Sequence, residues 1–168
     1  MCPEIFPPFV ANASKTTMLG CLQSALLEGS SLDIITSSFE VATLLHLDGW
    51  QSVNKIRILV GSPDKPSNRV EFLQTLYRSD ERSIEAAKLQ NDNLTGLSDV
   101  CQAIRSGKIE IRGYLKDKLH ASAYLVSNHN GYLDGMIGSS DFTHDDLRYG
   151  LELNANISSE VAKEIEKF

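Results

Sequence analysis

The chain has 168 residues, the length of one domain with a single hydrophobic core. Hydrophobic residues make up 42% and charged residues 23%, which is typical of a globular protein, and no apolar run reaches the roughly 18 residues that a membrane span needs. The formal net charge of −6 opposes binding of a polyanion over the whole surface, and three widely spaced cysteines argue against a disulfide framework or a zinc knuckle.

The first fourteen residues are rich in proline and are predicted to form an extended arm, followed by one domain over 15–168. This N-terminus lacks the basic start and long apolar centre of a secretory signal, so we expect a cytoplasmic protein. Cys21 and Cys101 lie in helical patterns, and we expect both to be buried.

Helical and strand patterns alternate along the chain. The hairpin signal over 128–131 predicts antiparallel pairing of the strands on either side. A charged break is expected within the long helix around 79–82, and Ser37 and Ser38 are expected to cap the helix that follows them. Helices are predicted over 16–28, 40–46, 68–89 and 97–105, from 143 and from 160, and strands over 32–36, 55–60, 109–115, 119–126, 133–137 and 152–157.

This order of elements predicts an α/β domain with a mixed β-sheet flanked by helices on both faces. The loop over 61–66 follows a strand end, a position where open α/β sheets commonly bind ligands.

Two of the predicted strands carry polar side chains of the kind found in functional sites. Residues 119–125 and 151–157 alternate strictly between apolar and polar, and a Gly-Ser-Ser turn lies between them. An ordinary edge strand also alternates, but its polar face usually carries Lys, Glu and Thr. The polar positions here are His120, Ser122, Tyr124, Glu152, Asn154 and Asn156.

These segments resemble the phospholipase D superfamily, whose signature is His-x-Lys, a spacer and Gly-Ser-x-Asn. Lys118-Leu-His120-Ala-Ser122 is similar to the first half and Gly138-Ser139-Ser140-Asp141 to the second. Glu152 matches a Glu found after the Gly-Ser turn in nuclease-like domains of restriction endonucleases and bacterial helicases. The resemblance runs from about residue 32 to 157, but the Lys of the motif is Ser122 and the Asn is Asp141.

The resemblance implies phosphodiester cleavage without a metal or another cofactor. A His attacks phosphorus to form a phosphohistidine, and a His from a second motif copy protonates the leaving group. One copy in this chain therefore implies a symmetric homodimer, in which His120 is the nucleophile of one subunit and the acid of the other. The implied catalytic residues are His120, Glu152 as the group that orients its imidazole, Ser139 and Ser122, and the implied substrate-binding residues are Ser140, Asp141, Lys118, Asn154 and Tyr124.

The two departures weaken the implied chemistry. Removing one preorganised group that stabilises a polar transition state costs a factor of about 10²–10³ in rate. A carboxylate at position 141 also repels a bound phosphate unless it is protonated or paired. Lys118, two residues before His120, is the best replacement for the missing cation if the strand begins that early; Lys116 and Arg148 are alternatives.

Basic residues are concentrated just before the His120 strand. Between Arg105 and Lys118 there are five basic and two acidic side chains, and this stretch is either a phosphate-facing patch or a solvated strand and loop. We expect the other three histidines, His46, His129 and His144, to lie at the surface without a role.

Three hypotheses follow. The first is a metal-independent nuclease domain that acts on DNA as a homodimer through His120. The alternative is a catalytically degenerate copy, with Ser122 and Asp141, that serves as a nucleic-acid-binding or dimerisation module attached to a helicase or a restriction system. The third, a lipid-cleaving phospholipase, is disfavoured because the chain has one motif copy and no interfacial amphipathic helix. None of the three places the chain in a membrane.

Overall fold

The protein is described by a computed structural model over residues 6–12, 16–62, 69–90, 96–131 and 133–167. These residues form a mixed sheet of seven strands in the order β1-β7-β6-β5-β2-β3-β4. Strands β2, β3 and β4 are parallel to one another, and the remaining neighbours pair antiparallel. The strands are β1 (Phe9–Ala11), β2 (Gly29–Thr36), β3 (Lys55–Val60), β4 (Ile109–Gly113), β5 (Ser122–Asn128), β6 (Leu133–Gly138) and β7 (Leu153–Ile157).

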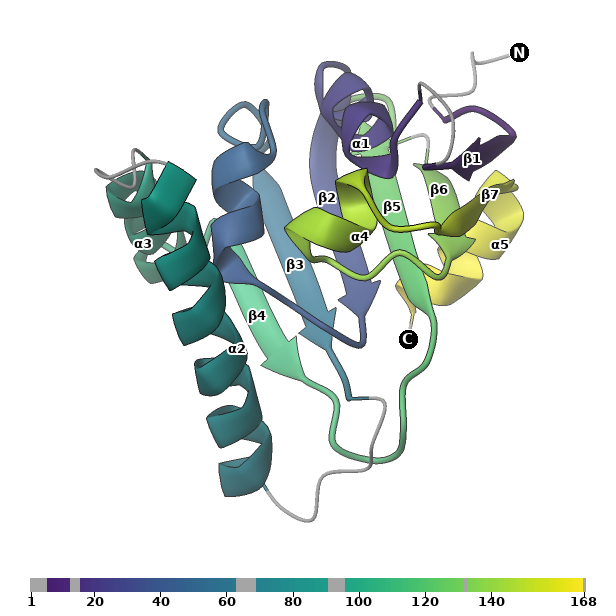
Figure 1. Cartoon of the computed structure of the whole chain (residues 1–168). Coiled ribbons are helices and arrows are strands. Elements are labelled where there is room, and N and C mark those ends of the chain that lie inside the picture. Colours follow the sequence, from purple (N-terminus) through teal and green to yellow (C-terminus); the bar gives the residue numbers. More distant parts are fainter. Residues whose placement is uncertain (1–5, 13–15, 63–68, 91–95, 132, 168) are drawn as a thin grey trace.

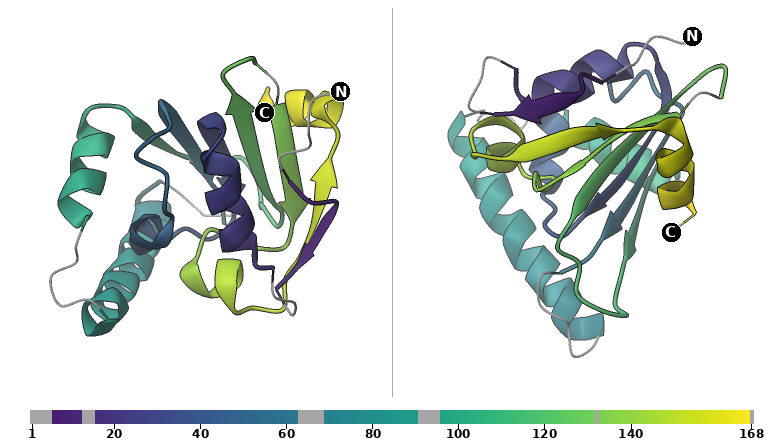
Figure 2. Two further views of the ribbon diagram at one scale, coloured as in Figure 1. Left: turned by 90° about the horizontal axis from the view of Figure 1, so that it is seen from above. Right: turned by 90° about the vertical axis from the view of Figure 1, so that its right-hand side faces the viewer.

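Helices cover the two faces of this sheet unequally (Figure 1). We call the face that α1 and α4 cover the front face, and α5 lies alone on the opposite, back face (Figure 2). The helices are α1 (Met18–Leu26), the 3-10 helix η1 (Val41–His46), α2 (Arg69–Gln90), α3 (Leu97–Arg105), α4 (His144–Arg148) and α5 (Ser159–Glu166). The predicted α/β fold with a mixed sheet and helices on both faces is confirmed.

The main hydrophobic core lies between the sheet and the front helices. Inward-facing residues of the parallel strands, such as Leu32 and Ile56, pack with Leu22 of α1, Val100 of α3 and Leu147 of α4, and all five are buried. A smaller cluster on the back face joins Leu125 and Leu133 to Ala162 of α5. Both helix layers therefore follow from the alternation of side chains along the strands.

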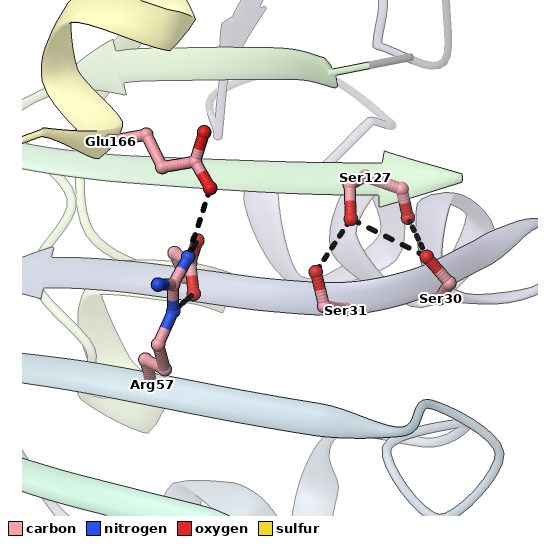
Figure 3. Close-up of polar contacts among 6 residues, drawn as sticks. Ser30, Ser31, Arg57, Ser127 and Glu166 are labelled. Carbon is pink, nitrogen blue, oxygen red and sulfur yellow. Dashed lines mark hydrogen bonds and ion pairs between the residues drawn. The ribbon is translucent and has the colours of Figure 1, made fainter. Parts of the chain in front are cut away.

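A polar contact also ties α5 to the back face. The Arg57 guanidinium on β3 bonds the Asp33 carboxylate on β2 and lies 3.1 Å from Glu166 of α5 (Figure 3). Hydrogen bonds and charge from these two carboxylates raise the pKa of Arg57 above its usual value. The Ser31 and Ser127 hydroxyls lie 2.6 Å apart on the neighbouring strand pair, β2 and β5.

The N-terminal stretch that was predicted as an extended arm adds the edge strand β1, which pairs with β7. Phe6 is buried, and its backbone N–H donates to the buried Asp134 carboxylate at 3.0 Å. Residues 1–5, 13 and 14 of the predicted arm lie outside the described residues, as do Cys2 and residues 63–66 of the predicted ligand loop.

Three local predictions are wrong. Helix α2 has no break at 79–82, because the Asp80 carboxylate turns inward and accepts from the Val41 N–H of η1 at 2.8 Å. Residues Ser37 and Ser38 do not cap η1, which begins after Glu40 without a side-chain cap. Cys101 is exposed, whereas Cys21 is buried as expected. No helix in the described ranges has the length and apolarity to cross a bilayer.

Candidate functional site

The motif residues gather at one edge of the sheet, which we call the site edge. Parallel strands β2 and β3 end there at Thr36 and Val60, β5 begins there at Ser122, and β6 ends there at Gly138. Pairing of Ser122 with Gly138 brings the two halves of the motif together. The hairpin predicted from 128–131 is what sets this register, and Gly131 adopts φ 75° within its turn.

His120 does not lie on a strand, contrary to the prediction. Leu119 donates its backbone N–H to Ser62 O, and its side chain fills the space where Gly61 lacks a Cβ. These contacts hold residue 119 in the connection from β4, so that pairing with β6 starts only at Ser122. His120 is exposed at the site edge, and it does not share a strand face with Ser122 or Tyr124.

Asp141 lies at the centre of a hydrogen-bonded network that includes Ser122 and the residues at the end of β2. Ser122 Oγ donates to its carboxylate at 2.6 Å and Ser37 Oγ at 2.7 Å, and the Ser37 N–H lies at 2.9 Å. The Thr36 Oγ1 atom is a fourth contact of the same carboxylate, at 2.9 Å. The two residues that differ from the resembled motif, Ser122 and Asp141, are therefore hydrogen-bonded to each other, with the Ser122 hydroxyl as the donor.

The network keeps Asp141 ionised. Burial raises the pKa of this carboxyl, but the bonds from Ser122, Ser37 and Thr36 outweigh burial and leave the pKa below its usual range. Sequence reasoning assigned Ser37 to a helix cap and gave Thr36 no role. The signal in the sequence was the run Thr36-Ser37-Ser38 at the end of a buried strand, which could have indicated hydroxyl groups at the site edge.

Three further candidates form a buried support behind this network. Tyr124 Oη donates to Ser140 O at 2.8 Å, and Asn154 Nδ2 donates to Ser140 Oγ at 2.7 Å. All three residues are at most 1% exposed, so they contact protein rather than solvent. The polar face of β7 is thus its buried face, whereas Leu153 on the opposite face is 55% exposed.

Ser139 and Glu152 lie closer to solvent. Ser139 Oγ accepts the N–H of Leu153 at 3.1 Å, and the Ser139 N–H donates back to Leu153 O. Glu152 lies outside β7, and its N–H bonds Gly150 O. Among the described residues no hydrogen bond joins Glu152 to His120, so the implied orienting contact stays a prediction.

Carboxylates surround the buried part of the site. Burial raises the pKa of Asp146, and the charges of Glu152, Asp141 and Asp145 raise it further. Burial also raises the pKa of Glu40, with smaller contributions from Asp145 and Asp146. Several carboxylates therefore lie close enough for their charges to act on one another here, which is unfavourable for a bound phosphate.

The basic stretch over 105–118 is not one patch. Arg105 and Lys108 precede β4, and Lys116 and Lys118 follow it, so these two pairs lie at opposite ends of this strand. Lys118 is exposed in the connection before β5, where the strand that would have aligned it with His120 has not begun. Lys116 and Lys118 lie with His120 in the connection between β4 and β5.

Across the described ranges, no group of three or more His, Cys, Asp or Glu side chains is arranged to hold a metal ion.

No protein-family model and no curated protein sequence matches this chain. Among solved structures it is similar to the yeast tyrosyl-DNA phosphodiesterase, with a TM-score of 0.54 and 11% identity over 88% of this chain. The chain spans 30% of that enzyme. It is also similar to NucT from Helicobacter pylori, with a TM-score of 0.51 and 10% identity over 95% of this chain and 89% of that one. At these identities the likeness supports a common fold.

Proposed function

We propose that this domain binds nucleic acid on a phospholipase D-like fold and does not cleave it. The proposal combines the fold shared with a DNA phosphodiesterase and the motif resemblance with one observation on the site. Where the motif has a Lys and an Asn, this chain has the Ser122–Asp141 hydrogen bond and an ionised carboxylate. That carboxylate repels a phosphoryl group at the position where the motif would stabilise it.

The position of His120 favours a second function, which is metal-independent cleavage of a phosphodiester by a homodimer. The imidazole is exposed at the site edge, in the same connection as Lys118, and so it is accessible to a phosphodiester and to a second subunit. The resemblance implies a homodimer in which two His120 side chains share one phosphate without a metal. In that case a partner copy would have to supply the positive charge that this site lacks.

Reversing both substitutions tests the proposal. Ser122→Lys alone would place an ammonium group against the Asp141 carboxylate, where the two charges pair with each other rather than with phosphate. We therefore expect that S122K and D141N have no nuclease activity singly, and that the S122K/D141N double variant gains EDTA-resistant cleavage of a labelled DNA. His120→Ala in the double variant should abolish this cleavage and leave DNA binding within about threefold.

The parent, the two single variants, the double variant, and the His120→Ala forms of the parent and of the double variant therefore need a cleavage assay and a binding assay side by side. DNA binding by the parent without cleavage supports the proposed function. EDTA-resistant cleavage by the parent that His120→Ala removes would instead support the nuclease, and the solution mass of the parent would then have to be that of a dimer. Absence of DNA binding by the parent at low salt would overturn both.

A further inference from the structure

Two histidines that the site does not use are stacked on each other. The His46 ring, at the end of η1, and the His144 ring, at the start of α4, have centroids 4.2 Å apart and an interplanar angle of 27°. The Tyr149 ring meets His144 edge-on, with centroids 5.6 Å apart, and the Arg148 guanidinium lies 5.3 Å from the Tyr149 ring. Both imidazoles are half-buried.

The surroundings favour the neutral form of both rings. Burial lowers the pKa of His46, and the positive charge of Arg148 lowers it further, with Asp48 acting in the opposite direction. Burial, His46 and Arg148 lower the pKa of His144. Asp145 is the carboxylate that opposes these effects at His144.

Other charged groups of the neighbouring elements face the same region without reversing this balance. Glu40 precedes η1, and its carboxylate accepts the backbone N–H of His144 at 3.4 Å. Asp80 of α2 and Asp146 of α4 lie close enough to Glu40 to raise the pKa of its carboxyl. The His144 Nε2 atom is buried and has no hydrogen-bond partner in the described part of the chain, so no acceptor is in place for a proton there.

We propose that the stacked His46 and His144 rings form an acid-sensitive contact between η1 and α4, which opens when both rings bind a proton. Two imidazolium rings 4.2 Å apart, with Arg148 beside them, repel one another. Opening displaces α4, which begins three residues after Asp141 and ends four residues before Glu152. The contact therefore couples pH to the geometry of the site edge.

The direction of the effect follows from linkage. In the closed state both pKa values lie below the ordinary histidine value of about 6.5, which the rings regain when they are exposed. The open state thus binds protons more readily. The population of the closed state is therefore highest above about pH 6.5 and decreases as the pH falls. The change in the closed-to-open ratio is about tenfold for each pKa unit by which a ring is depressed.

NMR on the full chain tests this contact in two ways. The imidazole signals should give pKa values below about 6.5 for His46 and His144, and either value at or above 6.5 overturns the proposal. Amide exchange in α4, corrected for intrinsic rates, should rise about tenfold or more from pH 7.5 to 5.5. His129, exposed in the β5–β6 turn, provides the matched control, since His129→Gln should leave this rise unchanged.

Replacing both rings with uncharged ones separates charge from packing. In the H46F/H144F variant the rings can still stack but cannot bind a proton, so the pH-dependent rise in α4 exchange should fall below about twofold. A rise equal to that of the parent would overturn the proposal. If this variant does not fold, the single H46F variant and the two imidazole pKa values of the parent decide the question.

Discussion

The Asp141 carboxylate is the residue on which the candidate site depends most. Its bonds from Ser122 and Ser37 are charge-assisted, and they hold together β5, the end of β2 and the turn after β6. Asp141→Asn keeps the size of the side chain but removes the charge and one acceptor. We expect the free energy of unfolding to fall by about 1–3 kcal/mol at pH 7, measured by urea denaturation.

The matched control is Asp145→Asn, which changes an exposed carboxylate four residues away. It should cost no more than about 0.5 kcal/mol. Because the pKa of Asp141 is lowered by folding, its contribution is present above the unfolded value of about 3.9 and is lost as the pH falls through the folded pKa. The difference between the parent and D141N should therefore shrink in acid, and a constant difference would contradict this role.

At single residues, the sequence indicated the chemistry of the site better than its geometry. The alternation around Ser122 and Asn154 predicted polar side chains on one strand face, and both do lie on the front face. That face is buried, which the pattern could not reveal, because burial depends on α4 and on the turn after β6. The roles of Ser37 and His144 depend on contacts with residues about a hundred positions away, which no local pattern encodes.

At the scale of elements, the contact between β6 and β7 shows why position 138 requires Gly. A Cβ added at Gly138 would lie 2.1 Å from Leu153 O and 2.4 Å from Asn154 Oδ1. Because the first of these atoms is backbone, the strands would have to separate. We expect Gly138→Ala to lower the free energy of unfolding by about 1–3 kcal/mol.

Gly20 in α1 is the control for this substitution, since its added Cβ meets nothing closer than 3.4 Å. Gly20→Ala should leave stability unchanged or raise it by up to about 1 kcal/mol, because Ala is the better helix former. Thermal unfolding of the two variants distinguishes a specific close approach from a general intolerance of added methyl groups. Equal losses of stability in the two variants would contradict a specific close approach at Gly138.

At the scale of the whole molecule, the order of helices and strands was sufficient to predict the α/β class. Strand β3 and helix α3 have the bounds that their apolar patterns predicted, and the hairpin signal gave the β5–β6 pairing. The start of β5 and the continuity of α2 were not predicted correctly, because Leu119 and Asp80 are held by distant partners. Local patterns therefore predicted where elements lie, and tertiary contacts decide where they end.

The distribution of charge over the molecule limits how it can bind nucleic acid. With a net charge of −6 and several carboxylates at the site, the nucleic-acid binding that we propose would depend on exposed cations in the connection that carries His120, chiefly Lys116 and Lys118. Each lysine that contacts a phosphate of duplex DNA contributes about 0.9 to the slope of log affinity against log salt concentration. The K116Q/K118Q variant should therefore bind DNA more weakly and with a salt slope reduced by about 1–2. Lys88→Gln, at an exposed position near the C-terminal end of α2, should leave both quantities unchanged, and an equal loss there would show that binding reports only total charge.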